Sequence, residues 1–289
     1  MSPDASAAGA ALGPVAEALA GVRARVKEPR PLGPGALDLA VEAEDAAAVR
    51  RAAQAALADL PVDVCVQPAN GRRKALLVAD MDSTIINVEC IDELADFAGV
   101  KDKVSAITEQ AMRGELDFEQ ALRERVAMLK GLPVTDLQLV YDQRVRLNPG
   151  ARILVRTMAR HARCLLVSGG FTFFTERVAA AAGFHENRGN TLGVEGDRLD
   201  GTVWDPILGR EAKLRALQRG MAEAGLLAQD TLAIGDGAND LAMIGAAGLG
   251  VAYRAKPVVA AQADARVDHA DLTALLYFQG YRAEEFVTG

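Results

Sequence analysis

Continuous apolar runs recur along the chain and indicate strands that are buried on both faces of a sheet. These runs occupy residues 75–79, 164–167, 231–234 and 249–252. Stretches with helical spacing of apolar positions lie between them, at residues 150–161, 171–182, 210–225 and 239–246. Because strands alternate with helices, the pattern predicts an α/β fold, namely an open Rossmann-like parallel sheet with right-handed crossovers.

Two segments depart from this alternation. Residues 88–148 contain no such apolar run and have helical character, with breaks at Gly99, Gly114 and Gly131. They predict a helical cap that is inserted after the first strand of the core. Residues 190–204 carry two short strand-like pieces, which predict a β-hairpin.

The N-terminal part of the chain has a different character. The Ala-rich stretch 5–22 favours a helix, and the Pro/Gly cluster 29–35 predicts a linker or turn. Strand-like residues 36–41 and 62–66 flank a helical pattern at 44–60, so we expect a small α+β module. The expected domains are this module (1–73), an α/β core (74–87 and 149–289) and the cap (88–148).

Composition excludes several classes of protein. The chain has 289 residues, and its 50% hydrophobic and 25% charged residues are typical of a globular protein. A net charge of −7 argues against nucleic-acid binding. Three widely spaced cysteines fit a reducing compartment and neither a disulfide framework nor a zinc site. No signal peptide or membrane-spanning stretch is recognisable, so we expect a cytoplasmic protein with no membrane partner.

Carboxylates follow two of the predicted strands. Asp80 and Asp82 come directly after the first run and share one face of an extended segment. Asp236 follows the third run, and ligands bind in this fold beyond the carboxyl ends of the strands. Mutual repulsion between carboxylates calls for a cation, and a set of oxygen ligands favours Mg²⁺. An aspartate beside Mg²⁺ can attack phosphorus.

A phosphate dianion also needs hydrogen-bond donors. Ser168, Gly169 and Lys213 supply a hydroxyl, an accessible backbone N–H and a cation. Each of these features is ordinary when it stands alone. Their recurrence at successive strand ends predicts a site for a small phosphorylated substrate.

The motifs resemble those of the haloacid dehalogenase superfamily of phosphotransferases. They are residues 80–84, 168–171, Lys213 and residues 235–240. Residues 88–94, 111–118 and 122–126 are in addition similar to the phosphoserine phosphatases of that superfamily. The resemblance covers residues 74–277 and leaves residues 1–73 unassigned.

The resemblance implies the roles of the acidic residues. Asp80 would be the nucleophile, and Asp82 the general acid and base. Mg²⁺ would be held by the Asp80 side chain, the Asp82 backbone carbonyl and Asp236. Asp240 would lie next to these metal ligands without touching the ion.

The remaining motif residues would bind the substrate. Ser168, Gly169 and Lys213 would hold the phosphoryl group, and Asn239 would contact it. Met112 and Phe118 would line an apolar wall of the cap.

Two cap residues suit the charges of an amino acid. Glu89 is the candidate for the ammonium group, and Arg125 for the carboxylate, which a guanidinium binds with two hydrogen bonds. On a helical wheel, Arg125 lies beside the apolar stripe of its helix and Arg123 points further round. Helical geometry and the resemblance therefore both favour Arg125.

The resemblance implies Mg²⁺-dependent hydrolysis of O-phosphoserine to serine and phosphate, the last step of serine biosynthesis. Two alternatives stay open, a phosphatase or phosphotransferase for a related compound such as phosphohomoserine and a catalytically silent amino-acid sensor. Residues 36–66 show a weak similarity to amino-acid-binding ACT modules. Dimerisation of two copies, feedback by serine and structural support are the open roles for residues 1–73.

Overall fold

The computed structural model describes residues 1–2, 5–112 and 115–289, without the side chains of residues 5, 111 and 112. Its described part contains a six-stranded sheet with the strand order β12-β11-β10-β5-β6-β7. All neighbouring strands in it are parallel. The strands are β5 (Leu76–Ala79), β6 (Arg163–Phe171), β7 (Glu186–Asn190), β10 (Thr231–Gly235), β11 (Leu249–Tyr253) and β12 (Ala265–Val267). This sheet confirms the predicted α/β class.

Helices cover both faces of the sheet because the central strands are apolar on both sides. Leu76 and Val78 of β5 pack on one face against α10 (Arg210–Ala224) and α11 (Leu241–Ala246). Leu77 and Ala79 point to the other face, which carries α8, α9 and α13. These helices are α8 (Ala151–Met158), α9 (Thr172–Ala182) and α13 (Ala274–Phe278). Short helices η1 (Ala228–Asp230), η2 (Ala238–Asp240), α12 (Pro257–Ala260) and η3 (Ala283–Glu285) complete the core.

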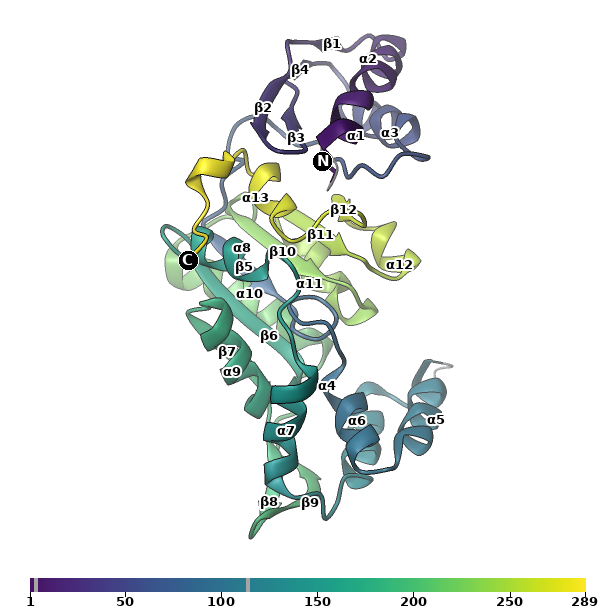
Figure 1. Cartoon of the computed structure of the whole chain (residues 1–289), viewed down its shortest axis with the longest axis vertical. Coiled ribbons are helices and arrows are strands. Elements are labelled where there is room, and N and C mark those ends of the chain that lie inside the picture. The colour runs from purple at the N-terminus through teal and green to yellow at the C-terminus, as the bar shows by residue number, and fades with distance from the viewer. Residues whose placement is uncertain (3–4, 113–114) are drawn as a thin grey trace.

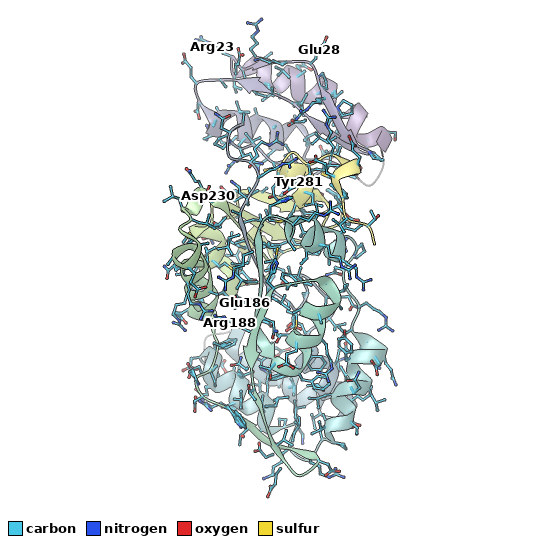
Figure 2. All side chains as sticks on the ribbon, turned by 90° about the vertical axis from the view of Figure 1, so that its left-hand side faces the viewer. Arg23, Glu28, Glu186, Arg188, Asp230 and Tyr281 are labelled. Atoms are coloured by element: carbon cyan, nitrogen blue, oxygen red, sulfur yellow. The ribbon has the colours of Figure 1, made fainter. Side chains whose placement is uncertain are left out.

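The sequence pattern missed β7 and β12. β7 lies at one edge of the sheet and has the polar sequence Glu-Asn-Arg-Gly-Asn. Figure 2 shows Glu186 and Arg188 of this strand close to each other, and Glu186 pairs with Arg163 of β6. An edge strand with one exposed side does not need a continuous apolar run. β12 is three residues long, too short to leave a pattern.

The described residues between β5 and α8 contain four helices, in line with the helical character predicted for this segment. They are α4 (Cys90–Phe97), α5 (Lys101–Met112), α6 (Phe118–Ala127) and α7 (Val134–Arg144). The chain enters and leaves this helical segment at adjacent positions, as the hydrogen bond from the backbone N–H of Asn87 to the carbonyl of Arg146 at 3.1 Å shows. The predicted hairpin is present as β8 (Leu192–Glu195) and β9 (Arg198–Val203), and β9 packs against α6 at the cap end of the molecule (Figure 1).

The N-terminal residues form a separate lobe at the opposite end of the molecule from the cap (Figure 1). It contains α1 (Ala5–Ala10), α2 (Leu12–Gly21), β1 (Arg25–Val26), β2 (Arg30–Gly33), β3 (Ala36–Asp38), β4 (Val41–Glu42) and α3 (Ala46–Ala56). The strands pair as two antiparallel ribbons, β1–β4 and β2–β3. The predicted linker or turn at 29–35 is thus mostly strand β2, and only residues 34–35 form the turn to β3, with Gly35 at φ +67°.

The predicted strand at residues 62–66 is wrong. These five described residues belong to no helix or strand. Their valines pack onto the apolar cluster of the lobe. The Asp63 carboxylate meanwhile accepts hydrogen bonds from the backbone N–H groups of Asp268, His269 and Ala270. The apolar alternation therefore reflects packing within the lobe, while Asp63 binds the core, and no strand pairing is formed.

No helix of the described residues is long and apolar enough to cross a membrane.

Candidate active site

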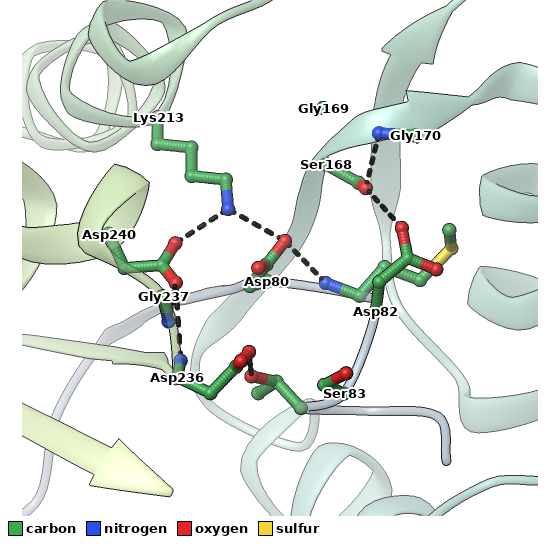
Figure 3. A network of polar contacts seen from close by, with 12 residues as sticks. Asp80, Asp82, Ser83, Ser168, Gly169, Gly170, Lys213, Asp236, Gly237 and Asp240 are labelled. Carbon is green, nitrogen blue, oxygen red and sulfur yellow. Dashed lines mark hydrogen bonds and ion pairs between the residues drawn. The ribbon is translucent and has the colours of Figure 1, made fainter. Parts of the chain in front are cut away.

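Polar side chains meet at the carboxyl ends of the central strands (Figure 3). Asp80 directly follows β5, Ser168 lies in the last half of β6, and Asp236 directly follows β10. Because neighbouring strands are parallel, these positions share one edge of the sheet. The structure therefore brings together the residues that the sequence placed at separate strand ends.

Lys213 is the centre of a buried charge network. Its Nζ lies 2.7 Å from Asp80 Oδ1 and 2.6 Å from Asp240 Oδ1. Burial acts to lower the pKa of Lys213, but the two carboxylates raise it, so the side chain is an ammonium. Burial and the charge of Asp240 act in turn to raise the pKa of Asp80, and Lys213 opposes them.

Asp240 also fixes the loop that carries Asp236. Its Oδ2 accepts hydrogen bonds from the backbone N–H groups of Asp236 at 3.2 Å and Gly237 at 3.0 Å. A Cβ atom at Gly235 would lie 2.3 Å from the Asp240 carboxylate, so a glycine is required there. Asn239 belongs to the same turn, η2, and lies half-buried beside Gly237.

Asp80, Asp236 and Asp240 form a compact cluster of carboxylates. One ligand oxygen from each lies within 4.8 Å of the others. Burial raises the pKa of Asp236 to about 6, although the Thr84 hydroxyl donates to its Oδ1 at 2.8 Å. The single positive charge of Lys213 does not neutralise the negative charge of three clustered carboxylates. The donor set therefore fits a hard divalent cation, which prefers oxygen ligands.

Asp82 points away from this cluster. Its Oδ2 accepts a 3.4 Å hydrogen bond from the Ser168 hydroxyl, and its Oδ1 accepts a 3.1 Å bond from the backbone N–H of Cys90. Burial, followed by the charge of Glu89, raises the pKa of Asp82 to about 7. The carboxyl thus lies on the Ser168 side of the site.

The last residues of β6 (Arg163–Phe171) lie close to the cap. The backbone N–H of Gly170 donates to the Ser168 hydroxyl at 2.8 Å. Phe118 is the first residue of α6, whose N-terminus is capped by Asp117. A Cβ atom at Gly169 would lie 3.1 Å from the Phe118 ring, so this aromatic ring covers the glycine.

The charged cap residues predicted for the substrate lie near one another. Glu89 is exposed, and its Oε1 accepts a 2.6 Å hydrogen bond from the Ser83 hydroxyl. Burial lowers the pKa of Arg125, and the charges of Asp92 and Glu89 act to raise it. Arg123 instead donates to Asp205 at 2.6 Å, outside this group. The side chain of Met112 lies outside the described residues.

Three residues of the site were given no role from the sequence. Thr84 holds Asp236, Ser83 holds Glu89, and Gly170 holds Ser168. The signal for two of them is their position in the Asp80–Thr84 motif. Their partners are distant in the sequence or on the cap, so only the fold reveals the contacts.

Comparisons with known proteins agree on one family. A family model for haloacid dehalogenase-like hydrolases matches residues 77–245. The phosphoserine phosphatase of Polaromonas sp. is 47% identical over 207 residues, which are 70% of this chain and 88% of that protein. A solved phospho-aspartyl intermediate analogue of phosphoserine phosphatase has 37% identity and a TM-score of 0.65, over 71% of this chain and 99% of the other.

One solved structure is similar over more of the chain. A HAD family hydrolase from Salmonella enterica serovar Typhi has 30% identity and a TM-score of 0.80, and the match covers 89% of each chain. Residues 74–289 alone do not account for that share. The likeness in fold therefore extends into the N-terminal lobe.

Proposed function

The chain belongs to the haloacid dehalogenase-like hydrolase family, and we propose that it hydrolyses O-phospho-L-serine to L-serine and phosphate. The observation that carries this proposal is the position of Asp80. It lies beside the only cation buried among the described site residues, opposite a cap that presents Glu89 and Arg125. The names of the relatives agree with this substrate.

Asp80 is suited to attack the phosphorus atom. Its Oδ1 accepts hydrogen bonds from Lys213 and from the backbone N–H of Met81 at 2.8 Å, which leaves Oδ2 as the attacking oxygen. As the bond from Oδ2 to phosphorus forms, the bond from phosphorus to the serine oxygen breaks. Asp82 gives its proton to that serine oxygen, because its Oδ2 lies on the Ser168 side of the site.

Asp82 then acts in the reverse sense. It takes a proton from water, the water oxygen attacks the aspartyl-phosphate, and phosphate leaves as the Asp80 carboxylate is regenerated. Lys213, the Ser168 hydroxyl and the Gly169 N–H would hold the phosphoryl oxygens while negative charge develops on them. Asn239, in the turn beside Gly237, would add an amide contact to the same group.

We propose that the divalent ion is Mg²⁺. Asp80, Asp236 and the Asp82 backbone carbonyl would hold it, and Asp240 would keep the Asp236 loop in place. When bound, the ion neutralises phosphate charge near the nucleophile. A carboxylate cluster with one lysine supports this assignment.

The cap would bind the amino acid part of the substrate. Glu89 would bind the ammonium group and Arg125 the carboxylate, while Phe118 would form an apolar wall. Met112 is assigned to the same wall by family resemblance alone. Hydrolysis of phosphoserine would complete the biosynthesis of serine.

We also propose that residues 1–73 act as a module of their own. They have their own apolar cluster, to which α2, α3 and the segment 62–66 contribute. Dimerisation, feedback by serine and structural support stay open as their role.

The proposal is tested by measuring phosphate release from a panel of phosphomonoesters with and without Mg²⁺. We expect phosphoserine to be the preferred substrate and Asp80→Asn to abolish turnover. Asp197→Asn, a change on the exposed tip of the β8–β9 hairpin, is the control. Preference for phosphohomoserine would support the related phosphatase, and absence of any turnover would support the amino-acid sensor. Equal turnover of esters without a carboxylate would contradict the role of Arg125.

A further inference from the structure

Ser83 has an unusual backbone conformation at the centre of the candidate site. Its φ is +55°, in the left-handed region that residues with a side chain adopt at an energetic cost. It stands between Asp82 and Thr84, which contact Ser168 and Asp236 respectively. Such outliers cluster at functional sites, so the conformation calls for a reason in its contacts.

The turn directs the Ser83 side chain toward the cap. Its backbone N–H donates to the carbonyl of Val88 at 3.2 Å, and its hydroxyl donates to Glu89 Oε1 at 2.6 Å. Figure 3 shows Ser83 on the Asp82 side of the site, away from Lys213. The hydroxyl thus joins the nucleophile loop of the core to the first turn of the cap.

Glu89 depends on this contact for its orientation. It is the N-cap residue of α4 and is exposed, and its side chain makes no capping hydrogen bond. Its charge also interacts with that of Arg125. Within the described contacts, Arg125 donates instead to the carbonyl of Ala121, at 3.2 Å, and does not pair with Glu89. Without the Ser83 hydroxyl, the exposed Glu89 carboxylate would be able to adopt other rotamers, and fewer of them would face the substrate ammonium group.

We propose that Ser83 is a positioning residue for recognition of the substrate ammonium group. By holding Oε1 of Glu89, it leaves Oε2 to face the ammonium. This inference rests on the proposed function and deepens it, because it assigns selectivity for an amine to a residue of the core. A purely structural turn would not affect that selectivity.

Two variants separate the hydroxyl from the backbone. Ser83→Gly removes the hydroxyl and places glycine, which tolerates positive φ, at the strained position. Ser83→Ala removes the hydroxyl and keeps the strain. Ser105→Ala, an exposed serine of α5, is the matched control. Steady-state kinetics are measured with phosphoserine and with 3-phosphooxypropanoate, which is the same compound without the amine.

We expect both Ser83 variants to raise the KM for phosphoserine about tenfold, as loss of a hydrogen bond to a charged group predicts, with kcat nearly unchanged. The KM for 3-phosphooxypropanoate should not change in either variant. Unchanged preference for the amine in the Ser83→Gly variant would overturn the inference. A rise in KM of equal size for both compounds would overturn it as well, because it would show a general effect on the loop.

A double-variant cycle gives an independent test. In the Glu89→Gln background, Ser83→Gly should add no further rise in the KM for phosphoserine. Additive effects would show that Ser83 does not act through Glu89. Wild-type protein that does not discriminate between the two compounds would refute the proposed function itself, and this result is distinct from a Ser83 variant that retains discrimination.

Discussion

Lys213 Nζ lies 2.6 Å from Asp240 Oδ1, and the two side chains are 2% and 0% exposed. The same ammonium contacts Asp80 at 2.7 Å, so one buried cation supports two buried carboxylates. Burying these three charged side chains costs a large desolvation energy, and the arrangement is stable only while the positive and negative charges compensate one another. The network therefore holds Asp80 in place and links it to the loop of Asp236.

Replacement of Lys213 should destabilise the metal-free protein. Lys213→Met removes the buried cation and leaves Asp80 and Asp240 without compensation, which costs about 3–5 kcal/mol. Urea unfolding at neutral pH in the presence of a chelator measures this loss. Lys103→Met, on the exposed surface of α5, should change the free energy of unfolding by less than about 0.5 kcal/mol. Equal stabilities of the two variants would show that Lys213 is not needed to compensate the carboxylates.

Gly170 is predicted to control the position of Asp82. A Cβ atom there would lie 2.7 Å from Asp82 Oδ2 and 3.0 Å from the Ser168 hydroxyl, so Gly170→Ala must displace the carboxyl. Small misplacements of catalytic groups cost up to about 100-fold in rate, and we expect kcat to fall by about 10- to 100-fold.

Gly245→Ala provides the comparison for this variant. Gly245 lies in α11 with no atom within 4 Å of an added Cβ, so alanine there should stabilise the helix by up to about 1 kcal/mol. Phosphate release measures the activity of both variants, and circular dichroism shows whether each variant is folded. Full activity of folded Gly170→Ala protein would show that Asp82 does not need its observed position.

The core sheet and the grouping of acidic residues at its strand ends could be predicted from the sequence because both depend on local patterns. The apolar runs around β5, β6 and β10 require burial on both faces, and the polar residues follow directly after the strands. The pattern failed for residues 62–66, where an apolar alternation packs against helices and forms no strand pairs. It also missed the edge strand β7, since an exposed side tolerates polar residues.

Contacts between distant segments explain what could not be predicted within the site. The Ser83–Glu89 hydrogen bond depends on a left-handed turn, and the Thr84–Asp236 bond joins residues 152 positions apart. Asp82 belongs to the same motif as Asp80, but its carboxylate accepts a hydrogen bond from Ser168. From spacing alone, Asp80 and Asp82 are expected on one face of the chain. Spacing does not reveal that Asp80 contacts Lys213 whereas Asp82 contacts Ser168.

Mg²⁺ should stabilise the folded protein. The ion would relieve repulsion among Asp80, Asp236 and Asp240, and a ligand at 100 times its Kd adds about 2.7 kcal/mol to the free energy of unfolding. We therefore expect Tm to rise with Mg²⁺ concentration and to fall when the ion is chelated. Asp236→Asn should abolish the rise, while Asp197→Asn, whose side chain is 90% exposed, should retain it. An equal rise in both variants would place the ion elsewhere.

Arg72 joins the N-terminal lobe to the core, and its contribution should depend on pH. It donates to both oxygens of Asp38 at 2.9 and 3.0 Å and to the carbonyl of Phe278 at 3.1 Å. Although burial acts to raise it, hydrogen bonds from Arg72 and Arg30 lower the pKa of Asp38 below its ordinary value of 3.8. The folded state thus favours the anion, so this stability is present above pH 3.8 and is lost as the pH falls through the folded pKa.

Arg72→Ala should accordingly destabilise the protein by about 1–3 kcal/mol near neutral pH. The difference from wild type should narrow as the pH falls below 3.8, where protonated Asp38 no longer pairs with Arg72. Chemical unfolding across this pH range measures both effects. Arg51→Ala, at a side chain that is 71% exposed and 3.9 Å from Asp45, should show neither. A difference between Arg72→Ala and wild type that stays constant with pH would assign the effect to the Phe278 carbonyl instead of Asp38.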